Sequence, residues 1–329
     1  MRAVTYDRFG PASEVLSLLD MPVPEPGAGE VLVRLHASGV NPSDVRVRAG
    51  GRPGVTAPPF PVIVPHSDGA GVIEAVGPGV PSDRIGQRVW IWNGQWRRPF
   101  GTAADYIALP SDQAVVLADH LSFEEGAVLG IPGLTAVHSV LGGGPVAGRR
   151  VLVSGGAGTV GRIAVQVAHA AGAEVIATAH GAEGVEAART AGADHVLDYS
   201  APDLAEQILA ATGGAAIDRI VEVEFGRNAE TNARVIAEGG TIASYGSAKD
   251  MTPELPFYPL MFKAVTIDLV LVYLLTPDQR RKAVDELATL IDRKALDLRL
   301  SAILPLAECA RAHEMVEAGN RAGSVILTL

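Results

Sequence analysis

Three glycines at a fixed spacing give the strongest chemical signal in the chain. Gly156, Gly158 and Gly161 follow an apolar segment, residues 151–154, and precede a segment with helical spacing, residues 162–171. A strand that turns into a helix in this way offers backbone N–H groups and the positive end of the helix dipole to an anion. Glycine permits the tight turn at 156, the approach of a diphosphate at 158 and close helix packing at 161. The pattern predicts a dinucleotide site made of Gly156, Ala157, Gly158, Thr159, Val160 and Gly161.

The end of the next strand bears on which nucleotide binds. A site for NAD usually carries Asp or Glu there, which binds the ribose 2′-hydroxyl and repels the 2′-phosphate of NADP. Here the residues are Thr178, Ala179 and His180, so the sequence favours NADPH over NADH. We expect Thr178 and His180 at the nucleotide, where His180 either donates to the phosphate or lies in a surface loop without a ligand. Glu183, close behind, weakens the preference for the phosphate.

Two rhythms along the chain predict two kinds of domain. The first 120 or so residues are dense in Gly and Pro and contain short alternating runs such as 31–35 and 71–76, which is typical of a compact, mostly β unit. From about residue 123, apolar runs alternate with helical segments, which predicts an α/β unit with a doubly wound parallel sheet. The strands expected there span residues 150–154, 174–178, 195–197, 219–223 and 241–245, with helices between them, for instance at 161–171 and 183–191.

The last part of the chain departs from this alternation. We expect a strand at 265–275, a helix at 277–293, a short helix at 306–318 and a closing strand at 324–329. The consecutive apolar residues at 269–273 indicate a strand that is either buried on both faces or paired across a subunit interface. The expected division is therefore residues 1–122 with 263–329 for the first domain, and residues 123–262 for the nucleotide-binding domain.

Composition and charge exclude several classes of function. A chain of 329 residues with 48% hydrophobic and 19% charged residues can fill two cores. A formal net charge of −10 disfavours nucleic acid and anionic lipid as partners. The longest apolar segment contains Asp268 and falls short of the ~18 residues of a membrane span. The start of the chain lacks the apolar region of a signal peptide, so we expect a cytoplasmic protein without a membrane partner.

A single cysteine limits the redox and metal chemistry of the chain. Cys309 rules out an internal disulfide and any zinc site built on several thiolates. Its neighbours predict a helix near the surface. We therefore expect Cys309 to be a small packed side chain rather than a reactive thiol.

Several further motifs occur in order along the chain, at residues 39–44, 67–77, 86–89, 130–136 and 192–199. With the glycine turn, they identify a resemblance over essentially the whole length to the zeta-crystallin-like quinone oxidoreductases. These are zinc-free members of the medium-chain dehydrogenase/reductase superfamily. The resemblance implies a GroES-like, mostly β catalytic domain and a Rossmann-type domain, and it makes a homodimer the expected assembly.

Three positions in this resemblance indicate whether the chain can bind a catalytic zinc ion. The places that supply Cys, His and Cys to the catalytic zinc of related alcohol dehydrogenases hold Asn41, Ser67 and Ile131 here. An amide, a hydroxyl and an alkyl group do not replace two thiolates and an imidazole at tetrahedral zinc. The four-cysteine lobe of the structural zinc is also absent from the sequence. His66 lies one position away from the ligand place, and alone it is expected to be a hydrogen-bonded histidine, so we expect no metal.

The resemblance also implies roles for individual residues. Asn41 and Asp44 match a pair beside the nicotinamide, where the Asn41 amide would bond a ribose or a substrate carbonyl, although Asn-Pro and Ser-Asp are also good turn formers. The other implied cofactor contacts are Pro132, Thr135, Tyr199, Gly246 and Ser247.

Some positions depart from the family pattern. Gly184 replaces a lysine that often meets the 2′-phosphate, and Thr159 replaces a glycine of the turn. Arg46, Trp92 and Trp96 are expected to line the substrate pocket, where the tryptophans either stack on a flat acceptor or simply pack.

Without a Lewis acid, reduction of an electrophilic acceptor is an easier task than oxidation of an alcohol. We expect an NADPH-dependent quinone oxidoreductase; the alternatives are an NADPH-dependent enone or enal double-bond reductase and, from another class, a non-catalytic NADPH-binding structural or regulatory protein. A small quinone or conjugated carbonyl is the expected substrate. Tyr106, Asp44 and water remain open as proton sources, since no spacing singles one out.

Overall fold

The computed structural model describes residues 1–51, 54–319 and 321–329. Contacts divide the chain into two compact units, which we call unit 1 (Met1–Ile131 with Leu298–Leu329) and unit 2 (Pro132–Asp297). The sequence predicted the same order of domains but placed the divisions after residues 122 and 262. Both divisions therefore move toward the C-terminus, to 131 and 297.

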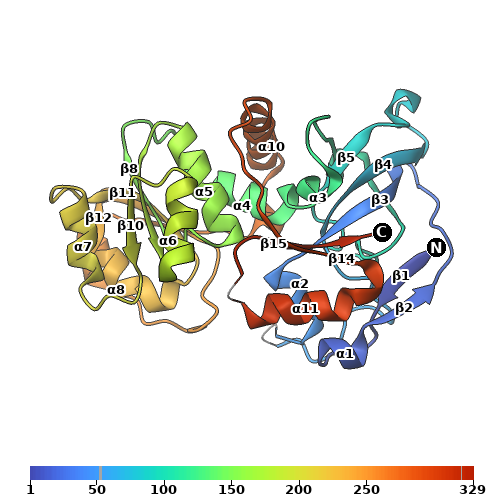
Figure 1. The fold of residues 1–329 in the computed structure, drawn as a ribbon, viewed down its shortest axis with the longest axis horizontal. Coiled ribbons are helices and arrows are strands. Elements are labelled where there is room, and N and C mark those ends of the chain that lie inside the picture. The colour runs from blue at the N-terminus through green and yellow to red at the C-terminus, as the bar shows by residue number, and fades with distance from the viewer. Residues whose placement is uncertain (52–53, 320) are drawn as a thin grey trace. The chain divides into compact units, whose positions relative to one another are not determined.

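Unit 1 is built around a mostly antiparallel sheet whose long central strand is β3 (Glu30–Val40). In Figure 1, the C-terminal strand β15 (Ser324–Thr328) lies beside β3, with which it pairs antiparallel, so segments far apart in the sequence share one sheet. The other strands of the unit are β1 (Arg2–Thr5), β2 (Ser17–Asp20), β4 (Asp68–Val76), β5 (Arg88–Ile91), β6 (Tyr106–Pro110), β7 (Ala114–Val116) and β14 (Leu300–Pro305). Its helical segments are α1 (Ala12–Val15), α2 (Pro42–Arg48), η1 (Ser82–Arg84), η2 (Ser111–Gln113), α3 (Phe123–Gly126), η5 (Leu306–Glu308) and α11 (Cys309–Ala318).

Buried and exposed side chains alternate along β3, so that one face of the sheet covers an apolar core. Val31, Val33 and Leu35 are buried in one apolar cluster, whereas Arg34 between them is exposed. Side chains of a strand point to opposite faces in turn, so a period of two places every second residue inside. The mostly β character predicted for this part of the chain is confirmed.

Unit 2 contains a six-stranded parallel sheet in the order β10-β9-β8-β11-β12-β13. The chain starts in the middle at β8 and winds outward both ways, which is the doubly wound arrangement expected from the sequence. The strands are β8 (Arg150–Val153), β9 (Glu174–Ala179), β10 (His195–Asp198), β11 (Ile217–Glu222), β12 (Ile236–Ser244) and β13 (Thr266–Leu269). The helical segments are η3 (Leu129–Gly133), which crosses the division between the units, and α4 (Leu134–Leu141), α5 (Thr159–Ala170), α6 (Gly181–Thr190), α7 (Leu204–Ala211), α8 (Phe225–Val235), α9 (Phe257–Phe262), η4 (Val272–Leu274) and α10 (Pro277–Asp292).

Residues 263–297 belong to unit 2, which corrects the expected second boundary. The reason is that β13 pairs in parallel with β12, and α10 contacts α4 of the same unit. The apolar run at 265–275 is also not one strand: β13 ends at Leu269 and a helical turn, η4, follows.

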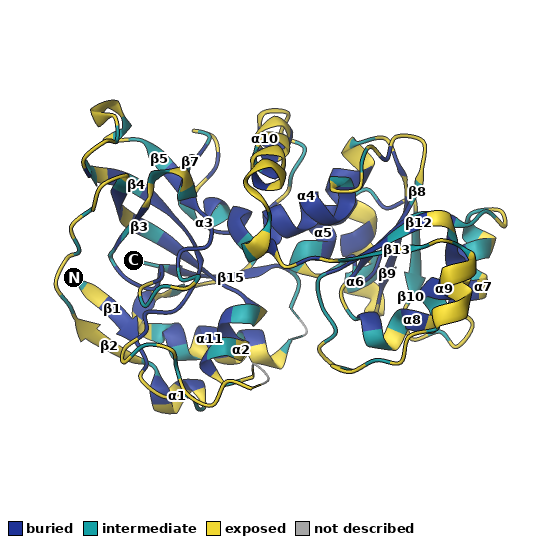
Figure 2. Ribbon diagram, turned by 180° about the vertical axis from the view of Figure 1, so that it is seen from behind, coloured by how far each residue is buried: buried dark blue, intermediate teal, exposed yellow. Residues whose placement is uncertain are grey.

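The apolar side chains around β13 are largely exposed within this chain. β13 is the last strand of the sheet, and Leu269 keeps 75% of its surface accessible. Figure 2 shows α9 mainly yellow, in agreement with the exposed Phe257, Tyr258 and Phe262. Burial on both faces within one chain is therefore excluded for this segment, and pairing across a subunit interface stays a prediction. None of the helices in the described residues has the length and apolar character of a membrane span.

Candidate functional site

The glycine turn of unit 2 joins β8 to α5. Gly155 has a φ of +70°, so the left-handed backbone of the turn falls one residue before the position predicted for it. Gly156 is needed for another reason, because a Cβ there would come within 2.8 Å of the Ala177 side chain. At Gly161 a Cβ would lie 2.1 Å from the carbonyl oxygen of Gly155, which confirms that the helix packs closely on the turn.

Gly158 is the one motif glycine whose missing side chain the protein itself does not require. It has a φ of −73°, which any residue adopts, and a Cβ there would meet only the Gly155 oxygen at 3.4 Å, an ordinary contact. Gly158 is also the N-cap of α5 and provides no side-chain cap for the helix. The described residues therefore leave the Cβ position of Gly158 unfilled beside this helix N-terminus, and the N–H groups and dipole of such a terminus favour an anion.

Thr178 holds the turn from the neighbouring strand. Its hydroxyl oxygen accepts a hydrogen bond from the Gly155 N–H at 3.1 Å, and its carbonyl accepts one from the Gly156 N–H at 2.8 Å. Thr178 is buried. The structure thus brings Thr178 to the glycine turn, as expected, but as a support for its backbone.

A second support is a carboxylate that sequence reasoning missed. Glu222, fully buried at the end of β11, accepts hydrogen bonds from the side-chain amides of Asn228 at 3.0 Å and Asn232 at 2.8 Å, and from the Glu224 N–H at 2.6 Å. Asn228 also donates to the hydroxyl of Ser154, the residue before the turn, at 3.0 Å. Glu222 therefore fixes the glycine turn on the side opposite to Thr178.

His180 and Tyr199 lie together at the end of β9 and β10, but with an acidic neighbour. The His180 ring nitrogen Nδ1 is 3.1 Å from the Asp198 carboxylate, and its ring centre is 5.4 Å from that of Tyr199. Hydrogen bonds from Ser200, and then from His180, lower the pKa of Asp198 to about 2. The ionised carboxylate of Asp198 thus lies beside His180, the residue expected to contact the phosphate. The sequence at residues 179 and 180 alone did not predict this acidic neighbour.

Unit 1 gathers two carboxylates around Asn41, the N-cap of α2. The Asn41 backbone N–H donates to Asp44 at 2.8 Å, and its side-chain amide donates to Asp68 at 2.7 Å. The Ile131 N–H donates to both oxygens of Asp68 at 2.9 Å. Burial, and then the charge of Asp44, raise the pKa of Asp68 well above its usual value. The expected pair of Asn41 and Asp44 therefore includes a third member, Asp68, whose signal in the sequence was only its place in a motif.

Comparisons with known proteins agree on one family. Residues 27–119 match the alcohol dehydrogenase GroES-like domain, and residues 159–289 match the zinc-binding dehydrogenase family. The human quinone oxidoreductase is 33% identical over 333 residues, which cover 100% of this chain and 98% of the relative. The chain is a member of the quinone oxidoreductase family of medium-chain dehydrogenases/reductases.

Solved structures resemble this quinone oxidoreductase family member over its whole length. A mycobacterial protein complexed with NADPH is 30% identical with a TM-score of 0.88, and the match covers 100% of both chains. The NADPH-complexed quinone oxidoreductase of Escherichia coli is 26% identical with a TM-score of 0.86, also over 100% of both chains. The GroES-like and Rossmann-type architecture expected from the sequence is confirmed.

Tyr106, which the sequence proposed for chemistry, lies apart from Asn41. Tyr106 pairs with Arg34, whereas Asp68 pairs with Gly39, so roughly 17 Å of β3 separate the two places. Tyr106 instead neighbours Glu74, which helps to raise its pKa. The structure thus does not bring Tyr106 to the carboxylate cluster.

The other three candidates have local surroundings of their own in unit 1. Trp92 is buried, and its indole N–H donates to the Asp112 carbonyl at 3.2 Å, which favours packing over stacking on a substrate. Trp96 is half-buried under the guanidinium of Arg97, 5.3 Å from the ring centre. Arg46 is exposed on α2. A pocket lined by these three residues stays a prediction.

The remaining predicted cofactor residues lie in unit 2. Thr135 is buried in the first turn of α4, and Pro132 is in the π-helical turn η3. The Gly246 carbonyl accepts from the Phe225 N–H at 3.0 Å, and the Ser247 hydroxyl accepts from the Gly226 N–H at 2.9 Å. Gly246 and Ser247 are thereby tied to the start of α8, whose Asn228 reaches the glycine turn through Ser154.

The acidic neighbour of His180 gives a testable prediction for this family member. Asp198→Asn keeps an oxygen for the Ser200 hydrogen bonds and removes a charge that would repel a 2′-phosphate. We expect the preference for NADPH over NADH to rise about three- to tenfold, the size of a surface charge effect. Because the pKa of Asp198 is about 2, the gain should be the same throughout the neutral range. Dissociation constants for both nucleotides, measured by fluorescence titration, provide the check.

Asp203→Asn is the matched control, since Asp203 is exposed on the same unit and Asn is an equally good N-cap. It removes the same charge without touching His180. An equal gain in both variants would mean that only the net charge of the protein matters.

Proposed function

We propose that this protein is an NADPH-dependent quinone oxidoreductase. The observation that carries the proposal is the open space at Gly158, next to the uncapped N-terminus of α5, in a turn supported by Thr178 and Glu222. The rat and human quinone oxidoreductases are 30% and 33% identical to this chain, and the similar mycobacterial and Escherichia coli structures were solved with NADPH.

The chain's own residues divide the work of binding. Gly158 and the first N–H groups of α5 receive the diphosphate, and His180 with Tyr199 faces the adenosine end. The bound nucleotide supplies a hydride from its reduced nicotinamide ring. Asn41, together with Asp44 and Asp68, is proposed to orient the acceptor, because Asn41 is fixed by hydrogen bonds to these two carboxylates.

We propose that the reaction needs no metal at the place used by zinc relatives. The Asn41 amide donates to a carboxylate, the Ile131 side chain offers no ligand atom, and Ser67 is a neutral hydroxyl. An acceptor that is already electrophilic, such as a quinone, suits a site without a Lewis acid.

Acceptor assays test this function directly. Purified protein is given NADPH with 1,4-benzoquinone, 1,2-naphthoquinone or a 2-alkenal, and NADPH oxidation is followed by its absorbance. The proposal expects quinones to give the highest kcat/KM. A higher kcat/KM for 2-alkenals would instead identify a double-bond reductase, and tight NADPH binding without turnover on any acceptor would identify a non-catalytic binding protein.

Asn41→Ala tests the acceptor-orienting role. We expect kcat/KM for quinone to fall about tenfold or more, because a fixed hydrogen-bond partner is lost and Asp68 loses one of its donors. The dissociation constant of NADPH should change less than twofold. Tyr106→Phe is the control, since Tyr106 lies beside exposed Glu74, and it should keep turnover near the wild-type value. A loss in Tyr106→Phe equal to that in Asn41→Ala would refute the assignment.

We further propose a cytosolic homodimer. The free edge of β13 and the exposed Leu269, Leu271 and Leu274 form an apolar edge of the kind that proteins cover. Light scattering should give twice the mass of the chain, and Leu269→Lys should shift it toward the monomer. The cytosol suits a chain with a single thiol, which cannot form an internal disulfide; cell fractionation checks this location.

A further inference from the structure

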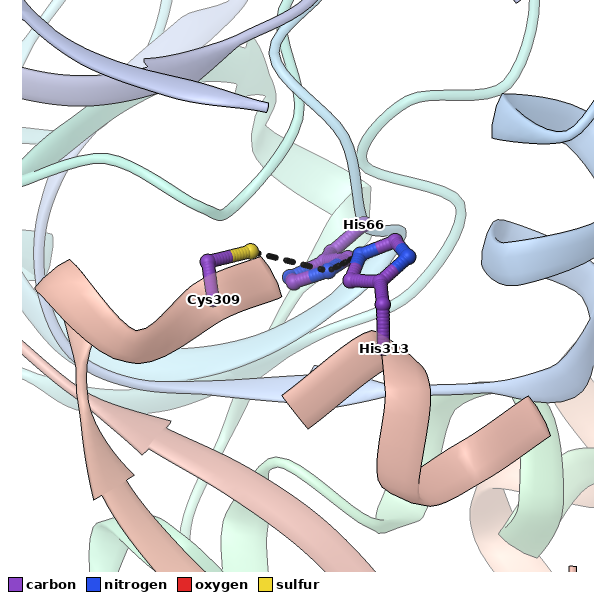
Figure 3. Close-up of side chains that lie close together, drawn as sticks. All are labelled: His66, Cys309 and His313. Atoms are coloured by element: carbon purple, nitrogen blue, oxygen red, sulfur yellow. Dashed lines mark hydrogen bonds between the residues drawn. The ribbon is translucent and has the colours of Figure 1, made fainter. Parts of the chain in front are cut away.

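Three potential metal ligands that are not among the residues assigned above meet in the interior of unit 1. The side chains of His66, Cys309 and His313 are at most 2% exposed, and one ligand atom from each lies within 4.8 Å of the others. Figure 3 shows Cys309 and His313 projecting from α11 toward His66, which precedes β4. Cys309 and His313 are four residues apart, so they occupy one face of the helix.

A chain of hydrogen bonds fixes the tautomer of His66. The Asp68 carbonyl oxygen can only accept, so the Thr102 hydroxyl donates to it at 2.6 Å. The Ser38 hydroxyl, 2.8 Å from Thr102, must then donate to Thr102, and its oxygen accepts from His66 Nδ1–H at 2.9 Å. His66 Nε2 is therefore unprotonated. This is the second-shell arrangement that orients a metal-binding histidine, with the far ring nitrogen donating to a fixed acceptor.

Two donors converge on this single lone pair. His313 Nε2 lies 2.9 Å from His66 Nε2, and the Cys309 sulfur lies 4.0 Å from it. His313 Nε2–H therefore donates to His66 Nε2, whereas His313 Nδ1 is buried without a hydrogen-bond partner in the described part of the chain. One lone pair thus faces two exchangeable protons, a geometry that a cation at the centre would satisfy with three ligands.

The backbone adds an independent sign. His66 has a φ of +78°, in the left-handed region that residues other than glycine rarely adopt. It is held there by a backbone hydrogen bond from Thr102 to the His66 carbonyl at 3.0 Å. Such local strain is characteristic of ligand clamps and functional sites.

We propose that His66, Cys309 and His313 form a buried site for one thiophilic d10 cation, Cu⁺ or Zn²⁺. Two imidazoles and a thiolate are the ligands that these ions prefer. Bonds of about 2.05 Å to nitrogen and 2.3 Å to sulfur place the two nitrogens roughly 3.3 Å apart and nitrogen and sulfur roughly 3.6 Å apart. The observed 2.9 and 4.0 Å each require a shift of less than an ångström.

Binding balances through one released proton. The Cys309 S–H bond breaks, sulfur binds the ion, and the proton leaves to solvent. The proton on His313 Nε2 moves to Nδ1 of the same ring. With Cu⁺ and the thiolate the site is neutral, which suits its burial, whereas Zn²⁺ leaves one positive charge that Asp44, whose charge acts on Cys309, would offset. The site uses none of Asn41, Ser67 and Ile131, so it is distinct from the place that zinc relatives use.

The test uses the full chain and the metals alone. Because the site is buried, reduced protein is unfolded in guanidinium and refolded without oxygen, either with one equivalent of Zn²⁺ or Cu⁺ or with none. We expect one bound ion per chain after gel filtration, retained against a chelator, and a higher Tm of the loaded protein. Competition with a chromophoric chelator gives the affinity of each ion.

Variants locate the bound ion. Cys309→Ser and His313→Gln should each weaken binding about 100-fold, whereas His120→Gln, at an exposed histidine outside the cluster, should not. X-ray absorption of the wild-type complex should show one sulfur and two imidazole ligands, and this measurement does not depend on a variant folding. A shell without sulfur, or no retained ion for either metal, would mean that the cluster is only a hydrogen-bonded histidine pair.

Discussion

Gly158→Asp is expected to weaken NADPH binding by about 100-fold or more while leaving unit 2 folded. The backbone at Gly158 suits any residue, and a Cβ there meets nothing closer than 3.4 Å. Asp is a better N-cap than Gly, so the helix should gain a few tenths of a kcal/mol. The same carboxylate would occupy the space of the diphosphate and repel its charge, and like charges in close contact cost several kcal/mol.

Two controls separate the physical causes of this loss. Gly158→Ser adds a neutral cap of similar reach, so the difference in affinity between the Ser and Asp variants measures the charge. Gly161→Ala places a Cβ 2.1 Å from the Gly155 oxygen and should lower Tm as well as affinity. Calorimetric titration with NADPH and thermal unfolding are measured on all three. Unchanged NADPH affinity in Gly158→Asp would show that the nucleotide does not lie on this turn.

Strands and helices whose residue pattern is visible in their own short segment of sequence were predicted well. The strands β8 to β12 were expected within about two residues at most ends, because apolar runs between glycines and helical segments need no distant partner to be recognised. β12 is the exception, since it begins five residues before the expected strand, in a segment with Glu238 and two glycines.

The second domain boundary was misplaced because the residues of a strand do not show which other strand it pairs with. The run at 265–275 is apolar enough to be a core strand of either domain, and only its pairing with β12 assigns it to unit 2. Its exposed Leu269 also shows that an apolar run and a buried strand are different things.

The candidate site divides in the same way. The glycine turn could be predicted because backbone conformation and close packing restrict residue types directly, although the left-handed residue proved to be Gly155. Asp68 and Glu222 are single carboxylates at strand ends. The hydrogen-bond donors to Asp68 come from residues 27 and 63 positions away in the sequence, so the sequence near Asp68 does not reveal its role. The donors to Glu222 are Asn228 and Asn232 of the following helix, α8. Tyr106 has a residue type suited to proton transfer, but the strand register pairs it with Arg34, far along β3 from the carboxylates around Asn41.

Glu222→Ala should produce the largest loss of stability among single changes near the turn. Removing this carboxylate takes the acceptor from the buried Asn232 amide and from the Glu224 N–H, and it leaves the half-buried Asn228 amide with Ser154 alone; each unsatisfied buried group costs about 1–3 kcal/mol. We expect a loss of about 3 kcal/mol or more, which lowers Tm by roughly 6–12 °C for a domain of this size.

The same change should also reach the nucleotide. Asn228 bonds both Glu222 and Ser154, so losing Glu222 frees the residue that leads into the glycine turn and should weaken NADPH binding several-fold. Glu222→Gln keeps one oxygen acceptor but turns an amide toward an amide, so its effects should be intermediate. Glu230→Ala, at an exposed position of the same helix as Asn228, should change stability by about 0.5 kcal/mol or less. Thermal unfolding and NADPH titration of the three variants decide the matter: if Glu222→Ala behaved like Glu230→Ala, the buried carboxylate would not be the support of the turn.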